Sequence, residues 1–166
     1  VDARDKNAIF RVDMKSLQVT AEWKIDGCEV PSGIAMDVAN QRLFVGCRGK
    51  GEVKPILAVV NAESGATVFT HEIGRQNGAV IYDAESKRVF TANGYDALLV
   101  IFEQTSPDAY KVVEALGTRP GARTMAFDAK SKKIYSLAGE GSADFAKKVN
   151  TSVGPFYPNT FFPNTV

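Results

Sequence analysis

The sequence predicts an all-β protein that forms part of a β-propeller, whose blades are sheets of four antiparallel strands. The first observation is a motif that occurs three times: an apolar run ends in Asp, and a basic residue follows five positions later. The three copies contain Asp37 and Arg42, Asp83 and Arg88, and Asp128 and Lys133. The copies recur after 46 residues (37 to 83) and 45 residues (83 to 128), a period typical of propeller blades. Turn residues also divide each copy into short β-type runs, as a four-stranded blade requires.

The best-preserved copy predicts one complete blade over residues 31–75. Its first strand is the run 33–36, which is apolar without polar alternation, as in strands buried on both faces. A turn rich in Asp and Asn follows, because these side chains bond nearby backbone N–H groups. The other three strands are predicted at 43–47, 56–60 and 66–73.

The same pattern predicts a second blade over residues 78–118. Residues 7–25 match only the second half of a blade, and residues 123–138 match only a first half. Together these units predict a single partial propeller domain over residues 1–166.

The repeat ends near Gly139, and residues 139–166 are predicted to be a Pro-rich loop or tail. Prolines in this stretch exclude the interior of a helix or of a central strand. They are Pro155, Pro158 and Pro163. We expect four aromatic residues to pin the loop against the sheets. These are Phe156, Tyr157, Phe161 and Phe162.

The predicted blades are too few for a closed propeller. Two full blades and two halves amount to about three, whereas propellers typically close with about four to eight. We therefore expect the chain to be a segment of a larger propeller, completed by further blades of the same protein or by self-association. Produced alone, it should be poorly soluble or oligomeric because its terminal blades lack packing partners.

Composition and charge restrict the classes of partner. The net charge is +1, from 20 Lys and Arg against 19 Asp and Glu, so no basic field favours nucleic acid. The longest apolar runs are too short to span a bilayer. Neither a membrane span nor nucleic-acid binding is therefore predicted.

The two cysteines, Cys28 and Cys47, are expected near each other if 32–37 and 42–47 form a hairpin. A disulfide would then be feasible in an oxidising compartment. We expect two buried thiols instead, because two cysteines do not define a disulfide scaffold.

The segments Ile34-Ala-Met-Asp37…Arg42-Leu-Phe-Val-Gly46 and 118–128 resemble the YVTN-type β-propeller repeat family, relatives of the lactonase-like seven-bladed propellers. The likeness covers residues 7–138. It implies a seven-bladed propeller of which this chain is the C-terminal part, with a periplasmic or secreted location. It implies no catalytic motif that can be transferred residue by residue.

Polar and charged residues gather on one rim of the predicted blades. The loops between second and third strands, and those between blades, share this rim, which is the more varied one. The predicted ligand-binding residues are Arg48, Arg75, Asn77, Asn93, Arg119 and Arg123. Arginine offers planar, bidentate donors to anions, which favours an anion site. The alternative is that these arginines cap carbonyl groups or pair with carboxylates of the rim.

We predict no catalytic residue, metal site or cofactor. His71 is the single histidine and lies in an outer strand, away from any recognisable nucleophile. The glycines at 46, 49 and 51 lack the Lys-Ser/Thr of a phosphate loop. The repeated Asp residues are expected to form turns rather than a carboxylate cluster.

The sequence therefore predicts a non-enzymatic β-propeller scaffold that binds a protein partner or a small anionic ligand on one rim. The alternative, suggested by the family resemblance, is a lactonase-like hydrolase whose catalytic residues lie largely in blades outside this chain.

Overall fold

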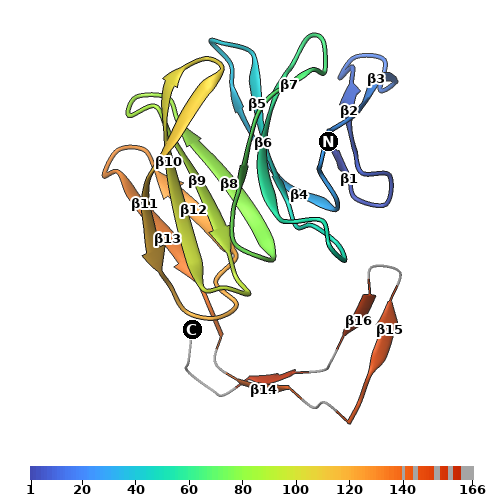
Figure 1. Cartoon of the computed structure of the whole chain (residues 1–166), viewed down its shortest axis with the longest axis vertical. Coiled ribbons are helices and arrows are strands. Elements are labelled where there is room, and N and C mark those ends of the chain that lie inside the picture. The colour runs from blue at the N-terminus through green and yellow to red at the C-terminus, as the bar shows by residue number, and fades with distance from the viewer. Residues whose placement is uncertain (140, 144–145, 152–153, 157–158, 162–166) are drawn as a thin grey trace.

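The computed structural model describes residues 1–139, 141–143, 146–151, 154–156 and 159–161 of the chain. All regular secondary structure in these residues is β, and every strand pairing is antiparallel (Figure 1). The predicted fold class is thereby confirmed.

Two complete four-stranded sheets form the centre of the molecule. The first has the order β4 (Pro31–Asp37), β5 (Arg42–Cys47), β6 (Ile56–Asn61) and β7 (Thr67–Glu72). The second has the order β8 (Asn77–Asp83), β9 (Arg88–Asn93), β10 (Leu98–Ser106) and β11 (Ala109–Gly117).

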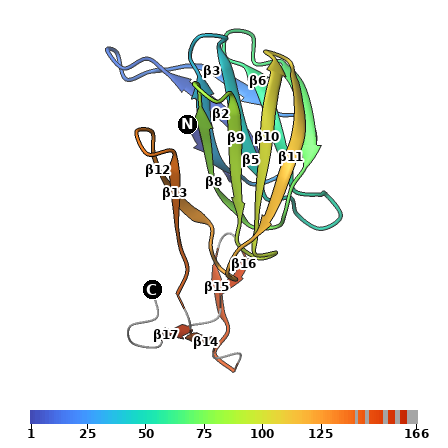
Figure 2. The same cartoon turned by 90° about the vertical axis from the view of Figure 1, so that its left-hand side faces the viewer.

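Incomplete sheets flank these two blades. Three strands precede them, β1 (Asp2–Ala3), β2 (Ala8–Val12) and β3 (Val19–Lys24). A two-stranded sheet of β12 (Thr124–Asp128) and β13 (Lys133–Leu137) follows them. It lies beside β8 (Figure 2), where the rings of Phe90 and Phe127 stack with centroids 6.2 Å apart.

The predicted tail contains short strand pairs rather than only loop. β14 (Gly141–Ala143) pairs with β17 (Asn159–Phe161), and β15 (Val149–Thr151) pairs with β16 (Gly154–Phe156). Pro155 lies in β16, where a two-stranded sheet tolerates a residue without an N–H donor. The predicted anchoring by Phe156, Tyr157, Phe161 and Phe162 concerns side chains outside the described part of the structure.

The core lies in two layers, one on each face of the first blade. Successive residues of a strand point to opposite faces of a sheet, so Phe44 packs towards the second blade and Val45 towards β2. In β6, Val59 likewise packs towards the second blade and Val60 towards β2. The middle strands of the blade are therefore buried on both faces.

The inner strand β4 was expected to be buried on both faces, and this is wrong. Its alternate residues Ile34 and Met36 are 37% and 43% exposed. Gly33 and Ala35 face the second blade, whereas β1, the strand of the flanking sheet that contacts β4, has only two residues and leaves Ile34 and Met36 uncovered.

The repeated Asp residues form turns, as predicted. Asp37, Asp83 and Asp128 each accept a hydrogen bond from a backbone N–H two or three residues later. Asp37 also accepts a bond of 2.9 Å from Nε2 of Gln104 in the second blade. Burial favours the neutral acid, but the hydrogen bonds from Asn40 and Gln104 outweigh it and lower the pKa of Asp37. This carboxylate therefore links the two blades.

We predict that Asp37→Ala lowers the free energy of unfolding by about 2 kcal/mol, because the buried amide of Gln104 and the turn at Asn40 lose their acceptor. The lowered folded pKa means that this contribution is complete above about pH 4 and is lost as pH falls through the folded value. Urea unfolding at pH 7 and at pH 3 measures both effects. Asp128→Ala is the matched control, since exposed Asp128 bonds only its own turn. Equal losses in both variants would contradict the inter-blade role.

The open edge of β13 predicts self-association of residues 1–166 produced alone. Tyr135 is 58% exposed, whereas Phe44 and Phe90 at the same repeat position are 0% and 8% exposed. An unpaired edge with apolar side chains is a template for pairing. Sedimentation velocity should show species larger than a monomer that diminish in the variant Tyr135→Lys/Leu137→Lys. A monomer at every concentration would contradict this expectation.

Candidate functional site

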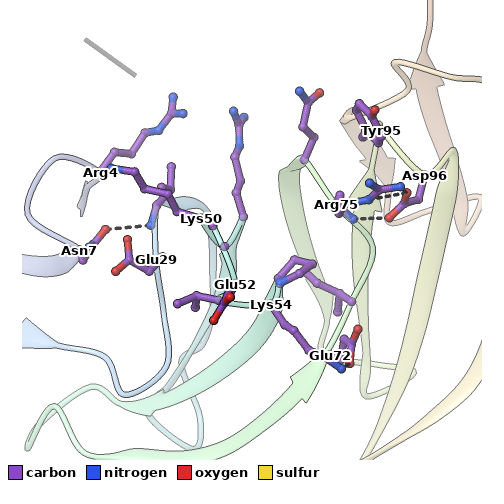
Figure 3. A pocket seen from close by; sticks show the side chains of 18 of the residues that line it. Arg4, Asn7, Glu29, Lys50, Glu52, Lys54, Glu72, Arg75, Tyr95 and Asp96 are labelled. Carbon is purple, nitrogen blue, oxygen red and sulfur yellow. Dashed lines mark hydrogen bonds and ion pairs between the residues drawn. The ribbon is translucent and has the colours of Figure 1, made fainter. Parts of the chain in front are cut away.

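Loops on the predicted rim enclose a cavity of about 970 Å³ (Figure 3). They are the β1–β2 loop, the β3–β4 loop, the β5–β6 loop, the β7–β8 loop and the β9–β10 loop. The blades thus bring together loops that are far apart in the sequence.

Charged side chains of both signs line the cavity. The cationic residues are Arg4, Arg48, Lys50, Lys54 and Arg75, and the acidic residues are Asp5, Glu29, Glu52, Glu72 and Asp96. Lys54 forms an ion pair of 2.8 Å with Glu72. Positive charge at that end of the cavity is therefore neutralised by the protein itself.

Arg75 is bound by its own neighbour, as the alternative interpretation of the rim arginines anticipated. Its Nε and one terminal nitrogen donate to Oδ1 of Asp96 at 2.9 and 2.6 Å. Its backbone N–H donates to Oδ2 of the same carboxylate at 2.7 Å. The guanidinium also lies 4.4 Å from the ring centroid of Tyr95. These contacts lower the pKa of Asp96.

Arg48 differs from Arg75 because no carboxylate forms an ion pair with it in the described part of the chain. It is partly buried, and its Nε donates to the backbone oxygen of Asn77 at 2.8 Å. Burial, with the positive charges of Arg4 and Arg123, lowers the pKa of Arg48 to about 10. Arg48 is therefore a cation held among cations.

Arg123 lies next to this group, because two glycines leave space for it. A Cβ atom added at Gly94 would lie 2.9 Å from Cβ of Arg123, and one added at Gly78 would also lie 2.9 Å from it. Arg119 is exposed in the same connection between β11 and β12. Neither arginine lines the cavity itself.

Asn77 and Asn93 were predicted to bind a ligand, but both side chains are fully buried. Nδ2 of Asn77 donates to the oxygens of Ala79 and Ala92 and to Oδ1 of Asn93, each at 3.2 Å. Nδ2 of Asn93 donates to the backbone oxygens of Thr91 and Leu98. A buried amide must find its hydrogen-bond partners within the protein. The two side chains therefore bond backbone oxygens near the rim ends of β8 and β9 and stabilise these strands.

Arg4 and Asn7 also line the cavity, although the sequence did not predict them as site residues. Oδ1 of Asn7 accepts a 2.8 Å bond from the N–H of Val30, which fixes the β3–β4 loop. The position of Arg4 in the repeat could have revealed it, because Arg4 directly follows β1 as Arg48 directly follows β5. Only two residues of β1 are present before it, too few to recognise a strand.

Cys28 and Cys47 form a disulfide, with Cα atoms 5.4 Å apart, so the expectation of two free thiols is wrong. The turn in which the N–H of Cys28 donates to the oxygen of Ile25 brings the cysteine back towards β5. The bridge precedes Arg48 directly, and the N–H of Arg48 donates to the oxygen of Val30 at 3.1 Å. The disulfide therefore holds the β3–β4 loop against the end of β5, and these two segments form neighbouring walls of the cavity.

The described residues contain no group of three or more His, Cys, Asp or Glu side chains suited to a metal ion. They also contain no helix long and apolar enough to cross a membrane.

Comparison with known proteins identifies the fold but not a family. No family model and no curated protein matches the sequence. Among solved structures, a chain of the mitotic checkpoint complex matches 81% of this chain with 18% identity and a TM-score of 0.68, over 40% of its own length. A chain of hydrazine synthase from Kuenenia stuttgartiensis matches 95% of this chain with 14% identity and a TM-score of 0.68, also over 40% of its length.

A third similar structure, a chain of a nidogen/laminin complex, matches 95% of this chain with 12% identity and a TM-score of 0.55, over 59% of its length. These likenesses, with the four-stranded sheets, define the chain as a β-propeller protein. It spans less than two thirds of the length of each of these three chains.

We predict that Cys28→Ser/Cys47→Ser lowers the free energy of unfolding by about 3 kcal/mol, because the bridge closes a loop with a sequence separation of 19. Urea unfolding under non-reducing conditions measures this loss. Reducing agent should have no further effect on the double variant. Unchanged stability would contradict the structural role of the bridge.

Proposed function

We propose that this β-propeller segment is a binding scaffold, and that a small anionic ligand binds at Arg48 on the rim. The observation that carries the proposal is the partly buried guanidinium of Arg48, which has cations for neighbours and no ion-paired carboxylate among the described residues. Removing a charge from water is costly unless it is paired. A bound anion would supply the missing counter-charge.

The donors of Arg48 support this proposal. Its Nε is occupied by the backbone oxygen of Asn77, which orients the guanidinium. The two terminal nitrogens have no hydrogen-bond partner within the described residues. A guanidinium held in this way presents a planar pair of donors, the geometry that matches a carboxylate, sulfate or phosphate oxygen pair.

Binding of a protein partner remains a prediction. Two of the similar structures are complexes, but no described residue points to a particular partner of this chain. No contact among the described residues favours the lactonase-like alternative over binding.

Membership of the YVTN-type repeat family, a seven-bladed whole and an exported location are part of the same proposal. The repeated motif around Asp37 and Asp83 supports the first. The disulfide supports the last, since disulfides persist in oxidising compartments.

We predict that Arg48→Gln weakens sulfate binding at least about tenfold, because a charge-assisted pair of hydrogen bonds is lost. Isothermal titration calorimetry at fixed ionic strength measures the affinity. Arg88→Gln is the matched control, since Arg88 is exposed at the opposite end of β9 and the change in net charge is the same. Equal weakening in both variants would mean that only net charge matters and would contradict the site.

A further inference from the structure

Three arginines around the proposed anion site come from three different connections between strands: Arg4 from the β1–β2 loop, Arg48 from the β5–β6 loop and Arg123 from the β11–β12 connection. In the two complete blades the second strand ends at a residue that pairs with the first residue of the third strand, and in the flanking sheet β1 and β2 stand in the same relation. These pairs are Ala3 with Ala8, Cys47 with Ile56 and Asn93 with Leu98. The next residue is Arg4 in the first sheet, Arg48 in the second and Gly94 in the third. Arg4 and Arg48 therefore occupy the same position of the repeat.

The third sheet has no arginine at this position, and Arg123 occupies the space instead. Arg123 lies five residues before the repeated Asp of its sheet, and Ser32 and Gly78 lie five residues before Asp37 and Asp83, so the three occupy the same position of the repeat. Because Gly94 has no side chain, Cβ of Arg123 fits 2.9 Å from the place where its Cβ would stand. Gly94 of the third sheet thus leaves space for Arg123, which directly precedes the first strand of the following sheet, β12–β13.

Arg4 and Arg123 lie close enough to Arg48 to act on it electrostatically. The charges of Arg4 and Arg123 both disfavour the charged form of Arg48, and Nε of Arg4 is buried without a hydrogen-bond partner among the described residues. Two of the five carboxylates lining the cavity, Glu72 and Asp96, are already paired with Lys54 and Arg75. In Figure 3 the Arg4 guanidinium extends away from Glu29 and Glu52, which lie below it in this view.

A single small anion compensates this arrangement poorly, because the three cations come from three different loops. From this geometry we propose that the ligand is a polyanion, with at least two anionic groups that contact different arginines of this group. The inference rests on the proposed function and specifies the class of ligand, a polycarboxylate or a short phosphate chain. Arg48 binds one group, and Arg4 and Arg123 bind the others.

The test compares sulfate, citrate and tripolyphosphate as probes of the 166-residue chain, by calorimetry at pH 7.5 and constant ionic strength. At least one polyanion should bind about tenfold more tightly than sulfate, since it engages more than one arginine. Arg123→Gln should remove most of this advantage and change sulfate affinity less than about twofold. Arg123→Lys, which keeps the charge, should retain it, and Arg88→Gln should behave as the wild type. Thermal melts establish that each variant is folded.

The outcomes separate the two proposals. Preference for citrate identifies polycarboxylates, and preference for tripolyphosphate identifies phosphate chains. Equal affinity for all three anions, with no effect of Arg123→Gln, overturns the polyanion inference and leaves the anion site at Arg48 standing. Absence of binding of every probe to the folded wild type overturns the proposed function itself.

Discussion

Face-to-face packing of neighbouring sheets is the constraint on which the rest of this structure depends. Strands β5 and β6 send alternate residues to two separate apolar layers, so each blade needs a neighbour on both sides. Where a neighbour is present, Phe44 is completely buried, and where it is incomplete, Ile34 and Met36 remain exposed. The same packing brings Asp37 against Gln104 and aligns the rim loops around one cavity.

Within this framework, a few substitutions at fixed repeat positions create the chemistry. The strand ends keep their pairing register, while the residue that follows changes from arginine to glycine between the first blade and the second. The position lies outside the two apolar layers, but a side chain at Gly94 would displace Arg123. The residue at this position therefore decides which blade carries a charge and where the next arginine can lie.

The pairing of the rim arginines also depends on individual neighbouring residues. Arg75 and Arg48 belong to adjacent loops of one cavity, yet Asp96 binds Arg75 through three hydrogen bonds and Arg48 has only a backbone oxygen. An arginine whose charge is compensated by a carboxylate of its own protein offers little to an anionic ligand. The charge of an arginine that bonds only a backbone oxygen remains uncompensated. The distinction separates structural from candidate binding arginines on a rim whose composition is nearly balanced in charge.

The sequence by itself determined the strands from β2 to β13, their turns and the propeller class. These depend on local patterns, such as the Asp whose carboxylate bonds a backbone N–H within three residues. Only the tertiary structure decided that Cys28 bonds to Cys47, that Asn77 and Asn93 are buried, and that Arg4 lies near Arg48. Those outcomes depend on register and on how sheets pack, because a shift of one residue moves a side chain to the other face. No pattern among neighbouring residues of the sequence predicts such contacts.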